Sequence, residues 1–181
     1  MAADLPGGLT FSVGVLTASD RGSRGEREDV SGKVIAEMVA AIGGEVRTYR
    51  VVPDDLEALK AAMIDMADRA KVTLLLTTGG TGFSPRDNTP EATAAAVERL
   101  VPGIPEAIRA YSMKITPRAM LSRATAGIRG RTLIINLPGS PKAVREVLEF
   151  ILPVLPHGLD VLAGEVADCG LPGQGDVQPS L

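Results

Sequence analysis

The chain has 181 residues, of which 45% are hydrophobic and 23% charged, a composition typical of a globular domain and incompatible with disorder throughout. The net charge of −3 and the aromatic content of 3% give neither the basic surface nor the stacking residues of nucleic-acid-binding proteins. The single cysteine, Cys169, excludes an internal disulfide, and no apolar run approaches the ~20 residues needed to span a membrane. The N-terminal residues lack the pattern of a signal peptide. We therefore expect a cytoplasmic protein without nucleic-acid or membrane partners.

The first half of the chain predicts two strands, each followed by a helix. The apolar run at 10–17 predicts a buried strand. After Ser31, apolar residues at three- and four-residue spacing predict a helix. Residues 45–52 predict the second strand, and either Asp54 or Asp55 can cap the helix that follows it.

The second half continues the alternation. The uninterrupted apolar run at 72–77 is typical of a central parallel strand that is covered on both faces. A helix is expected near Pro90, since proline is favoured at the first helical position, and another over 103–113. Residues 132–136 predict a further buried strand, and Pro141 opens the next helix.

Alternating strands and helices predict an α/β fold, a three-layer sandwich with a mostly parallel sheet. We expect one domain over 10–163, preceded by an extension at 1–9. Residues 164–181 are rich in glycine and proline, and we expect them to form a flexible tail.

A glycine-rich loop follows the central strand at the edge where ligands bind in open α/β sheets. Three glycines in four residues let backbone N–H groups approach an anion, and threonine hydroxyls add donors. A tight packed turn is the alternative, but the polar residues at 86–90 favour binding. The expected phosphate cradle comprises Thr78, Gly79, Gly80, Thr81 and Gly82.

Asp20, Asp54 and Asp87 each follow a predicted strand. Each of them can also be a helix cap or a turn residue. Together they can hold Mg²⁺ through oxygen and water ligands. An anion 4 Å from a phosphate charge is repelled by about 4 kcal/mol at an effective dielectric of 20, so several aspartates around a triphosphate require a cation.

The remaining candidates carry weaker signals. Ser122, Arg123 and Asn136 can donate to a ligand, or can cap a helix and complete a strand end. A Rossmann GxGxxG motif is absent, and the residues around Lys33 match a P-loop poorly, so we expect Lys33 on a solvated helix face. His157 has no nearby cysteine or histidine and is expected to be structural. The scattered basic residues are expected to be solvated: Lys114, Arg118 and Arg129.

With these motifs the sequence resembles the molybdopterin adenylyltransferases, the MogA/MoaB-like family that includes the G domain of gephyrin. The resemblance covers roughly residues 10–160. The run from Gly82 to Glu91 (GFSPRDNTPE) is its most specific part, and the charged loop from Arg21 to Val30 matches loosely. The matching segments are 17–20, 51–54, 77–93, 115–131 and 133–141.

The resemblance implies a molybdopterin-binding domain fold that assembles as a homotrimer. It implies transfer of AMP from Mg-ATP to the terminal phosphate of molybdopterin, with release of pyrophosphate, and a transient contact with the molybdate-insertion protein. It makes Asp54 and Asp87 the catalytic acids, which together with Asp20 hold Mg²⁺. It places further substrate contacts beside the glycine-rich loop, at Ser19, Ser122, Arg123, Asn136, Pro138, Gly139 and Ser140.

Two other functions remain open. A protein of the same fold can bind molybdopterin without adenylylating it, because a fold does not guarantee an activity. The three aspartates favour the enzyme, since a phosphate binder gains nothing from acids beside an anion. An unrelated nucleotide hydrolase is the third reading, although a P-loop and a clear base for water are both missing.

Overall fold

The computed structural model describes residues 11–164. The expected extension at 1–9 and the tail after Gly164, with Cys169, lie outside the described residues. None of the helices within 11–164 is long and apolar enough to cross a membrane.

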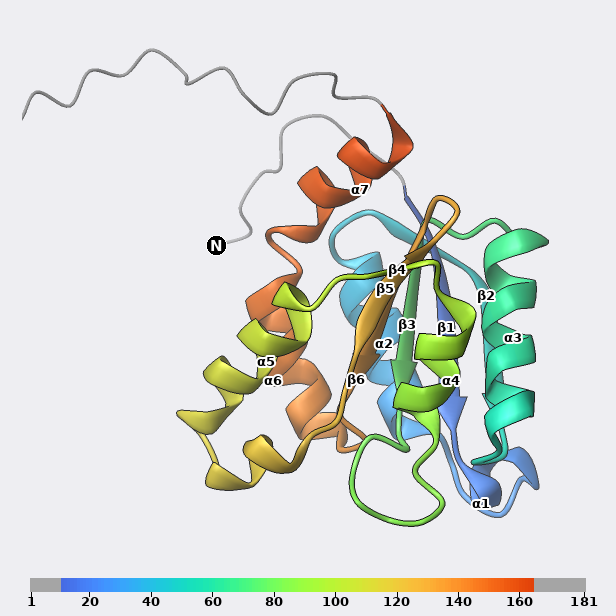
Figure 1. Ribbon diagram of the computed structural model, residues 1–181, viewed down its shortest axis with the longest axis vertical. Helices are drawn as coiled ribbons and strands as arrows, with labels where there is room; N and C mark the ends of the chain where they lie inside the picture. Colours follow the sequence, from blue (N-terminus) through green and yellow to red (C-terminus); the bar gives the residue numbers. More distant parts are fainter. Residues whose placement is uncertain (1–10, 165–181) are drawn as a thin grey trace, which may run out of the picture.

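Six strands form one sheet in the order β2-β1-β3-β6-β5-β4 (Figure 1). Strands β2, β1, β3 and β6 run parallel, and β5 and β4 complete the other edge in antiparallel pairing. This confirms the expected mostly parallel α/β sheet. The strands are β1 (Phe11–Ala18), β2 (Gly44–Val52), β3 (Leu74–Thr78), β4 (Arg99–Leu100), β5 (Ala126–Arg129) and β6 (Thr132–Leu137).

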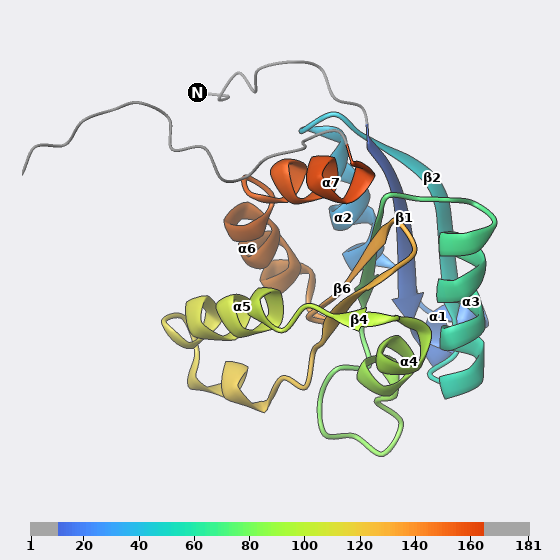
Figure 2. The ribbon, with the colours of Figure 1, turned by 45° about the horizontal axis from the view of Figure 1, so that its top comes forward.

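Helices cover both faces of the sheet, as expected for three layers (Figure 2). Helices α2, α5, α6 and α7 pack on one face, and α3 and α4 on the other. The helical elements are α1 (Asp20–Ser23), α2 (Val30–Ala40), α3 (Leu56–Asp68), α4 (Thr89–Ala96), α5 (Gly103–Met113), the 3₁₀ helix η1 (Pro117–Leu121), α6 (Pro141–Ile151) and α7 (Leu155–Ala163).

The central strands β1, β3 and β6 are mostly hydrophobic because both of their faces are buried. In β3, Leu74 and Leu76 belong to the core cluster beneath α2 and α6, while Leu75 belongs to the cluster beneath α3 and α4. In β6, Ile135 belongs to the cluster beneath α2 and α6, and Ile134 belongs to the cluster beneath α3 and α4. The period-two alternation of side chains therefore builds both cores from one strand.

Several short elements have no counterpart among the predicted ones, and the others lie close to their predicted positions. The antiparallel strands β4 and β5 are short, and β4 is exposed on both residues, so neither has a strand-like apolar pattern. Helix α1 overlaps the start of the charged segment from Arg21 to Val30, which was expected to be a loop, and η1 and α7 had no prediction. The expected helix over 103–113 is confirmed at both ends.

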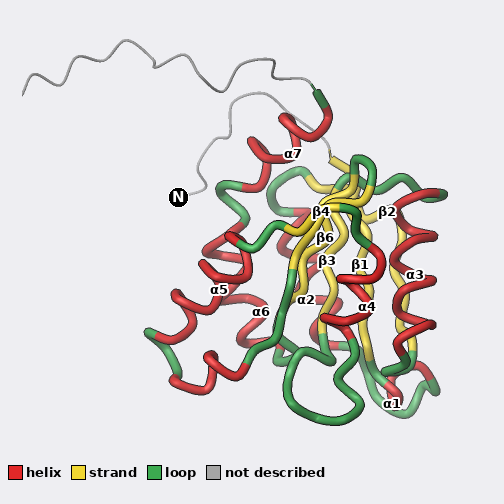
Figure 3. The backbone as a smooth tube through the Cα atoms, viewed as in Figure 1, coloured by secondary structure: helices red, strands yellow, loops and turns green. Residues whose placement is uncertain are grey.

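The carboxyl ends of β1, β2, β3 and β6 bring their loops to one edge of the sheet (Figure 3). The longest of these loops connects β3 to α4. This is the edge at which ligands bind in open α/β sheets, and the glycine-rich loop lies there as expected.

Candidate functional site

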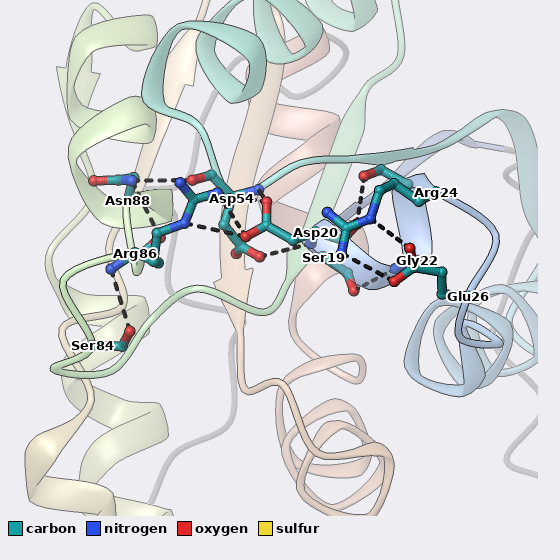
Figure 4. A network of polar contacts seen from close by, with 10 residues as sticks. Ser19, Asp20, Gly22, Arg24, Glu26, Asp54, Ser84, Arg86 and Asn88 are labelled. Atoms are coloured by element: carbon teal, nitrogen blue, oxygen red, sulfur yellow. Dashed lines mark hydrogen bonds and ion pairs between the residues drawn. The ribbon is translucent and has the colours of Figure 1, made fainter.

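Two of the three expected aspartates contact each other directly (Figure 4). The backbone N–H of Asp20 donates to Oδ2 of Asp54 at 3.0 Å, and the backbone N–H of Asp54 donates to Oδ1 of Asp20 at 3.1 Å. Asp20 opens α1 directly after β1, and Asp54 follows β2. Because β1 and β2 are parallel neighbours, the two turns lie side by side and each carboxylate holds the other's backbone.

Asp54 and Asp55 have different tasks, which the sequence left open. Oδ1 of Asp55 accepts the N–H of Ala58 at 2.9 Å, so Asp55 caps α3. Asp54 is therefore left for the site. Burial raises the pKa of the Asp54 carboxyl, and the nearby charges of Asp20 and Asp87 raise it further.

The third aspartate, Asp87, lies in the loop between β3 and α4. Its Oδ2 accepts the N–H of Ser84 at 3.0 Å, and its own N–H donates to the carbonyl of Ser84 at 2.9 Å. The same Oδ2 lies 2.9 Å from where a Cβ would stand on Gly82. Asp87 therefore lies against the glycine-rich loop, and its charge reaches Asp54.

The backbone of the glycine-rich loop requires glycine at two positions. Gly79 has φ +88° and Gly80 has φ +62°. A Cβ on Gly79 would lie 2.5 Å from the carbonyl oxygen of Ala18. A Cβ on Gly80 would lie 2.6 Å from Oγ1 of Thr89 and 3.1 Å from Oδ1 of Asp54. The loop thus crosses closely over the end of β1 and faces the Asp54 carboxylate.

Threonine hydroxyls fix this loop to its neighbours, and a serine hydroxyl from α2 binds the turn after β6. The hydroxyl of Thr78 donates to the carbonyl of Pro138 at 2.6 Å, and that of Thr89 donates to the carbonyl of Gly79 at 2.8 Å. The hydroxyl of Ser31 donates to the carbonyl of Gly139 at 2.8 Å. Thr78 is fully buried, so its expected role as a ligand donor becomes a structural one.

Asn136, an expected substrate contact, is fully buried. Its Nδ2 donates to Oγ1 of Thr77 at 2.9 Å and to Oγ1 of Thr93 at 2.8 Å, and its Oδ1 accepts the N–H of Thr125 at 3.1 Å. These bonds tie β6 to β3, to α4 and to the segment before β5. The expectation of a ligand contact is corrected, because the amide has no surface to offer.

Arg123, another expected substrate contact, is partly exposed and is bound to the loop between β3 and α4. Its Nε donates to the carbonyl of Gly82 at 2.6 Å, and its Nη2 donates to the carbonyl of Asp87 at 2.5 Å. It also pairs with Glu91. The guanidinium group therefore connects Gly82 to Asp87 and stabilises the conformation of the loop between β3 and α4.

Ser19 and Ser122 have local hydrogen bonds but also line cavities. Oγ of Ser19 accepts the N–H of Gly22 at 3.0 Å and so caps α1. Oγ of Ser122 accepts the N–H of Ala124 at 3.3 Å. Ser140 is the N-cap residue of α6 and makes no side-chain capping bond, which leaves its hydroxyl available.

Two cavities flank Gly139. A polar cavity of about 270 Å³ lies toward α2, and its lining includes Ser19, Asp29 and Ser31. A more apolar cavity of about 290 Å³ lies toward α5 and η1, and its lining includes Leu121. Gly139 lines both, so the expected contact segment at 138–140 forms the wall between two separate spaces beside the acidic cluster.

Arg86 is a site residue that the sequence reasoning did not single out. Its Nε donates to Oδ2 of Asp20 at 3.1 Å, and its Nη2 lies 2.6 Å from both oxygens of Asp20. This hydrogen bonding holds the pKa of the Asp20 carboxyl below its usual range. The polar run at 86–90 was the one sequence feature that pointed to Arg86. Its partner Asp20 lies 66 residues earlier in the chain, so the pair could not be read from the local sequence.

The expected three-aspartate Mg²⁺ site is not assembled. Within residues 11–164 no three His, Cys, Asp or Glu side chains lie in an arrangement that could hold a metal ion. Asp20 is paired with Arg86, while Asp54 and Asp87 are close enough for the charge of Asp87 to raise the pKa of Asp54. Mg²⁺ is commonly held by one or two carboxylates together with substrate phosphates, and this pair meets that requirement.

The other basic residues and the histidine divide as follows. Lys33 is exposed and paired with Glu28, and Lys114 and Arg118 are exposed, as expected. The expectation for Arg129 is wrong, because it pairs with Asp68 and donates to the carbonyl of Ala96 at 3.0 Å. His157 is exposed on α7. This helix lies at the opposite end of the molecule from the loop between β3 and α4 (Figure 1).

Comparison with known proteins gives a consistent set of relatives. The sequence profile of a family described as "Probable molybdopterin binding domain" matches residues 14–157. Over 157 residues the chain is 44% identical to the molybdopterin adenylyltransferase of Helicobacter pylori J99, and the match covers 86% of this chain and 89% of the relative. It is 47% identical to gephyrin of Dictyostelium discoideum over 160 residues, 83% of this chain and 22% of that protein.

A solved structure shows the same fold. The molybdopterin biosynthesis enzyme MoaB of Thermus thermophilus superposes with a TM-score of 0.80 at 52% sequence identity. The match covers 85% of this chain and 97% of that chain. At this coverage, the likeness extends over nearly all of the described domain.

Proposed function

This chain belongs to the family of probable molybdopterin binding domains, and from that premise we propose that it is a molybdopterin adenylyltransferase of molybdenum cofactor biosynthesis. The proposed reaction transfers AMP from ATP to the terminal phosphate of molybdopterin. The curated relatives that carry this name cover most of the chain, which supports the proposal for the whole domain.

One observation carries the proposal: a glycine cradle that faces two carboxylates. A Cβ added to Gly80 would lie 3.1 Å from Oδ1 of Asp54. A Cβ added to Gly82 would lie 2.9 Å from Oδ2 of Asp87. Backbone N–H groups in such a loop attract phosphate, whereas the carboxylates repel it. A triphosphate with its cation satisfies both, and a simple phosphate binder would have no use for the acids.

The residues then act by position and charge. A phosphate oxygen of molybdopterin attacks the α-phosphorus of ATP, and the bond from that phosphorus to the oxygen of the leaving pyrophosphate breaks. Because the attacking phosphate is already ionised at neutral pH, the site needs no general base. The glycine loop holds phosphate oxygens, and Asp54 and Asp87 fix the geometry of the charged group between them.

We propose that Asp54 and Asp87 hold Mg²⁺ together with the phosphates. The raised pKa of Asp54 supports this, since a carboxylate destabilised by burial and by neighbouring negative charge gains most from a bound cation. When bound, the ion neutralises charge that develops on the phosphates in the transition state. Asp20 belongs to the same site, but we do not assign it as a metal ligand of the free protein, because its carboxylate is paired with Arg86.

We also propose a cytoplasmic homotrimer that meets the molybdate-insertion protein transiently. Exposed apolar side chains around α5 and η1 support assembly, namely Met113, Ile115, Met120 and Leu121, which are each about half exposed. Analytical ultracentrifugation of the full chain tests the trimer. A monomer at micromolar concentration would refute it without affecting the proposed reaction.

The decisive experiment incubates the protein with molybdopterin, ATP and Mg²⁺ and measures pyrophosphate and adenylylated pterin. Asp54→Asn and Asp87→Asn should lose most of the turnover, while Asp68→Asn, at the end of α3, serves as a matched control. Product that requires both pterin and metal establishes the transferase. Pterin binding without product indicates a non-catalytic binding protein, and ATP breakdown without pterin indicates a hydrolase.

A further inference from the structure

Asp20, Asp54 and Asp87 form the acidic cluster at which the proposed function places a triphosphate. The guanidinium group of Arg86 contacts this cluster through Asp20. It donates three hydrogen bonds, and all of them go to the carboxylate of Asp20. The Arg86 side chain is 61% exposed and that of Asp20 31% exposed. Within the described part of the chain, Nη1 makes no hydrogen bond. The cation is therefore held by one accessible carboxylate and is otherwise open to solvent.

The backbone of Arg86 is fixed independently of this pair. Its N–H donates to Oγ of Ser84 at 3.3 Å, and its carbonyl accepts Nδ2 of Asn88 at 3.2 Å. The same Nδ2 donates to the carbonyl of Asp54 at 3.3 Å. The side chain of Arg86 can therefore leave Asp20 while the loop that carries it stays in place.

A second arginine near Asp20 is engaged differently (Figure 4). Nε and Nη2 of Arg24 donate to the two oxygens of Glu26 at 2.8 Å and 3.0 Å. Arg24 thus has a carboxylate partner outside the acidic cluster, while the partner of Arg86 belongs to the cluster itself. Of these two cations, Arg86 is the one whose release would alter the charge of the site.

We propose that Arg86 is a phosphate-binding residue of the transferase site, held on Asp20 in the free protein and transferred to phosphate oxygens of the bound nucleotide or pyrophosphate. Without Arg86, the carboxylate of Asp20 would be available to help Asp54 hold a cation. The proposal rests on the proposed function and adds to it a residue and an exchange of partners.

The chemistry favours this exchange. A guanidinium group binds phosphate with two parallel hydrogen bonds, which gives it an advantage over a lysine. An exposed ion pair contributes little to stability, so leaving Asp20 costs little. Asp20 and phosphate then compete for the same cation. Removing the charge of Asp20 should strengthen the binding of a metal-free phosphate anion, and removing Arg86 should weaken it.

A contact that merely holds the loop would behave otherwise. Breaking the pair from either end would loosen the loop and weaken anion binding in both variants. The test is calorimetric titration of the full chain with inorganic pyrophosphate in the presence of a chelator. The variants are Asp20→Asn, which keeps the oxygen that accepts the N–H of Asp54, then Arg86→Gln and the double variant, with Arg24→Gln as the control.

We expect Asp20→Asn to bind pyrophosphate about threefold more tightly than the natural chain, because only a weak exposed ion pair is released. Arg86→Gln should bind it about tenfold more weakly, with Arg24→Gln within about 1.5-fold. The double variant should bind as weakly as Arg86→Gln alone. Shifts of the same sign, equal affinities, or no binding by any variant would overturn the role of Arg86. These titrations contain no pterin and measure no turnover, so a protein that makes product can fail them, and one that makes none can pass.

Discussion

Asp20 and Asp54 hold each other's backbone: each carboxylate accepts the N–H of the other residue, at 3.0 and 3.1 Å. The pair joins the ends of two neighbouring strands that are 34 residues apart in sequence. It fixes the first turn after β1 against the turn after β2. It also brings two negative charges together. The two turns are therefore held in a fixed position, while the repulsion between the carboxylates destabilises the fold.

Asp54→Asn should therefore stabilise the protein while it removes turnover. The amide oxygen can still accept the N–H of Asp20, and the buried charge is gone. Because the folded-state pKa of Asp54 is raised, the charged carboxylate destabilises the fold at neutral pH, and partial exposure limits the gain to about 0.5 kcal/mol, or about 1–2 °C in Tm. The gain should disappear below the ordinary carboxyl pKa, where Asp54 is protonated in both folded and unfolded chains. Thermal unfolding at acidic and neutral pH measures it. A variant that is less stable than the natural chain at neutral pH would contradict the account.

Two aspartates should titrate on opposite sides of the ordinary value. Burial, with Asp20 and Asp87 nearby, raises the pKa of Asp54, and hydrogen bonding to Arg129 lowers the pKa of Asp68. Carbon NMR titration of the side-chain carboxyls in the free protein follows both in one experiment, with Asp68 as the internal control. Asp87→Asn removes one of the charges and should bring the pKa of Asp54 down. If Asp54 titrates at or below the ordinary value, its assignment as a destabilised acid fails.

Asn136→Ala should destabilise the protein by about 2–4 kcal/mol, because it leaves buried polar groups of Thr77, Thr93 and Thr125 without their partner. Chemical denaturation measures the loss. Thr93→Val removes one of the same bonds and should show a non-additive effect when combined with it. A variant of unchanged stability with a raised KM for pterin would return Asn136 to the substrate site.

Gly79→Ala should cost about 3 kcal/mol, since it combines a positive φ with a Cβ only 2.5 Å from the carbonyl oxygen of Ala18. That loss corresponds to a fall of about 6–12 °C in Tm. Gly158→Ala is the matched control, because it lies within α7 with open space around its Cβ and should gain about 0.5–1 kcal/mol. Equal stability of the two variants would show that the loop tolerates a different path.

Hydrophobic patterning determined the central parallel strands and their covering helices, because a strand that is buried on both faces must be mostly apolar. The glycine-rich break after β3 likewise marked the site loop, since few other residues accept the backbone of Gly79 and Gly80. These features are local, and each is readable within a dozen residues. The short antiparallel strands β4 and β5 were missed because their pairing depends on neighbours and not on their own sequence.

Tertiary structure decided how the polar residues are divided among tasks. Sequence placed Asp54 and Asp55 on equal terms, and the geometry of α3 made Asp55 the cap. Sequence offered Asn136 and Arg123 as ligand donors, yet Asn136 is fully buried, and Arg123 donates to the carbonyl of Gly82 within the loop between β3 and α4. Arg86 found its partner 66 residues away. The role of a polar side chain depends on which atoms lie within hydrogen-bonding distance. The strand order decides which segments are neighbours, and no local sequence pattern encodes that order.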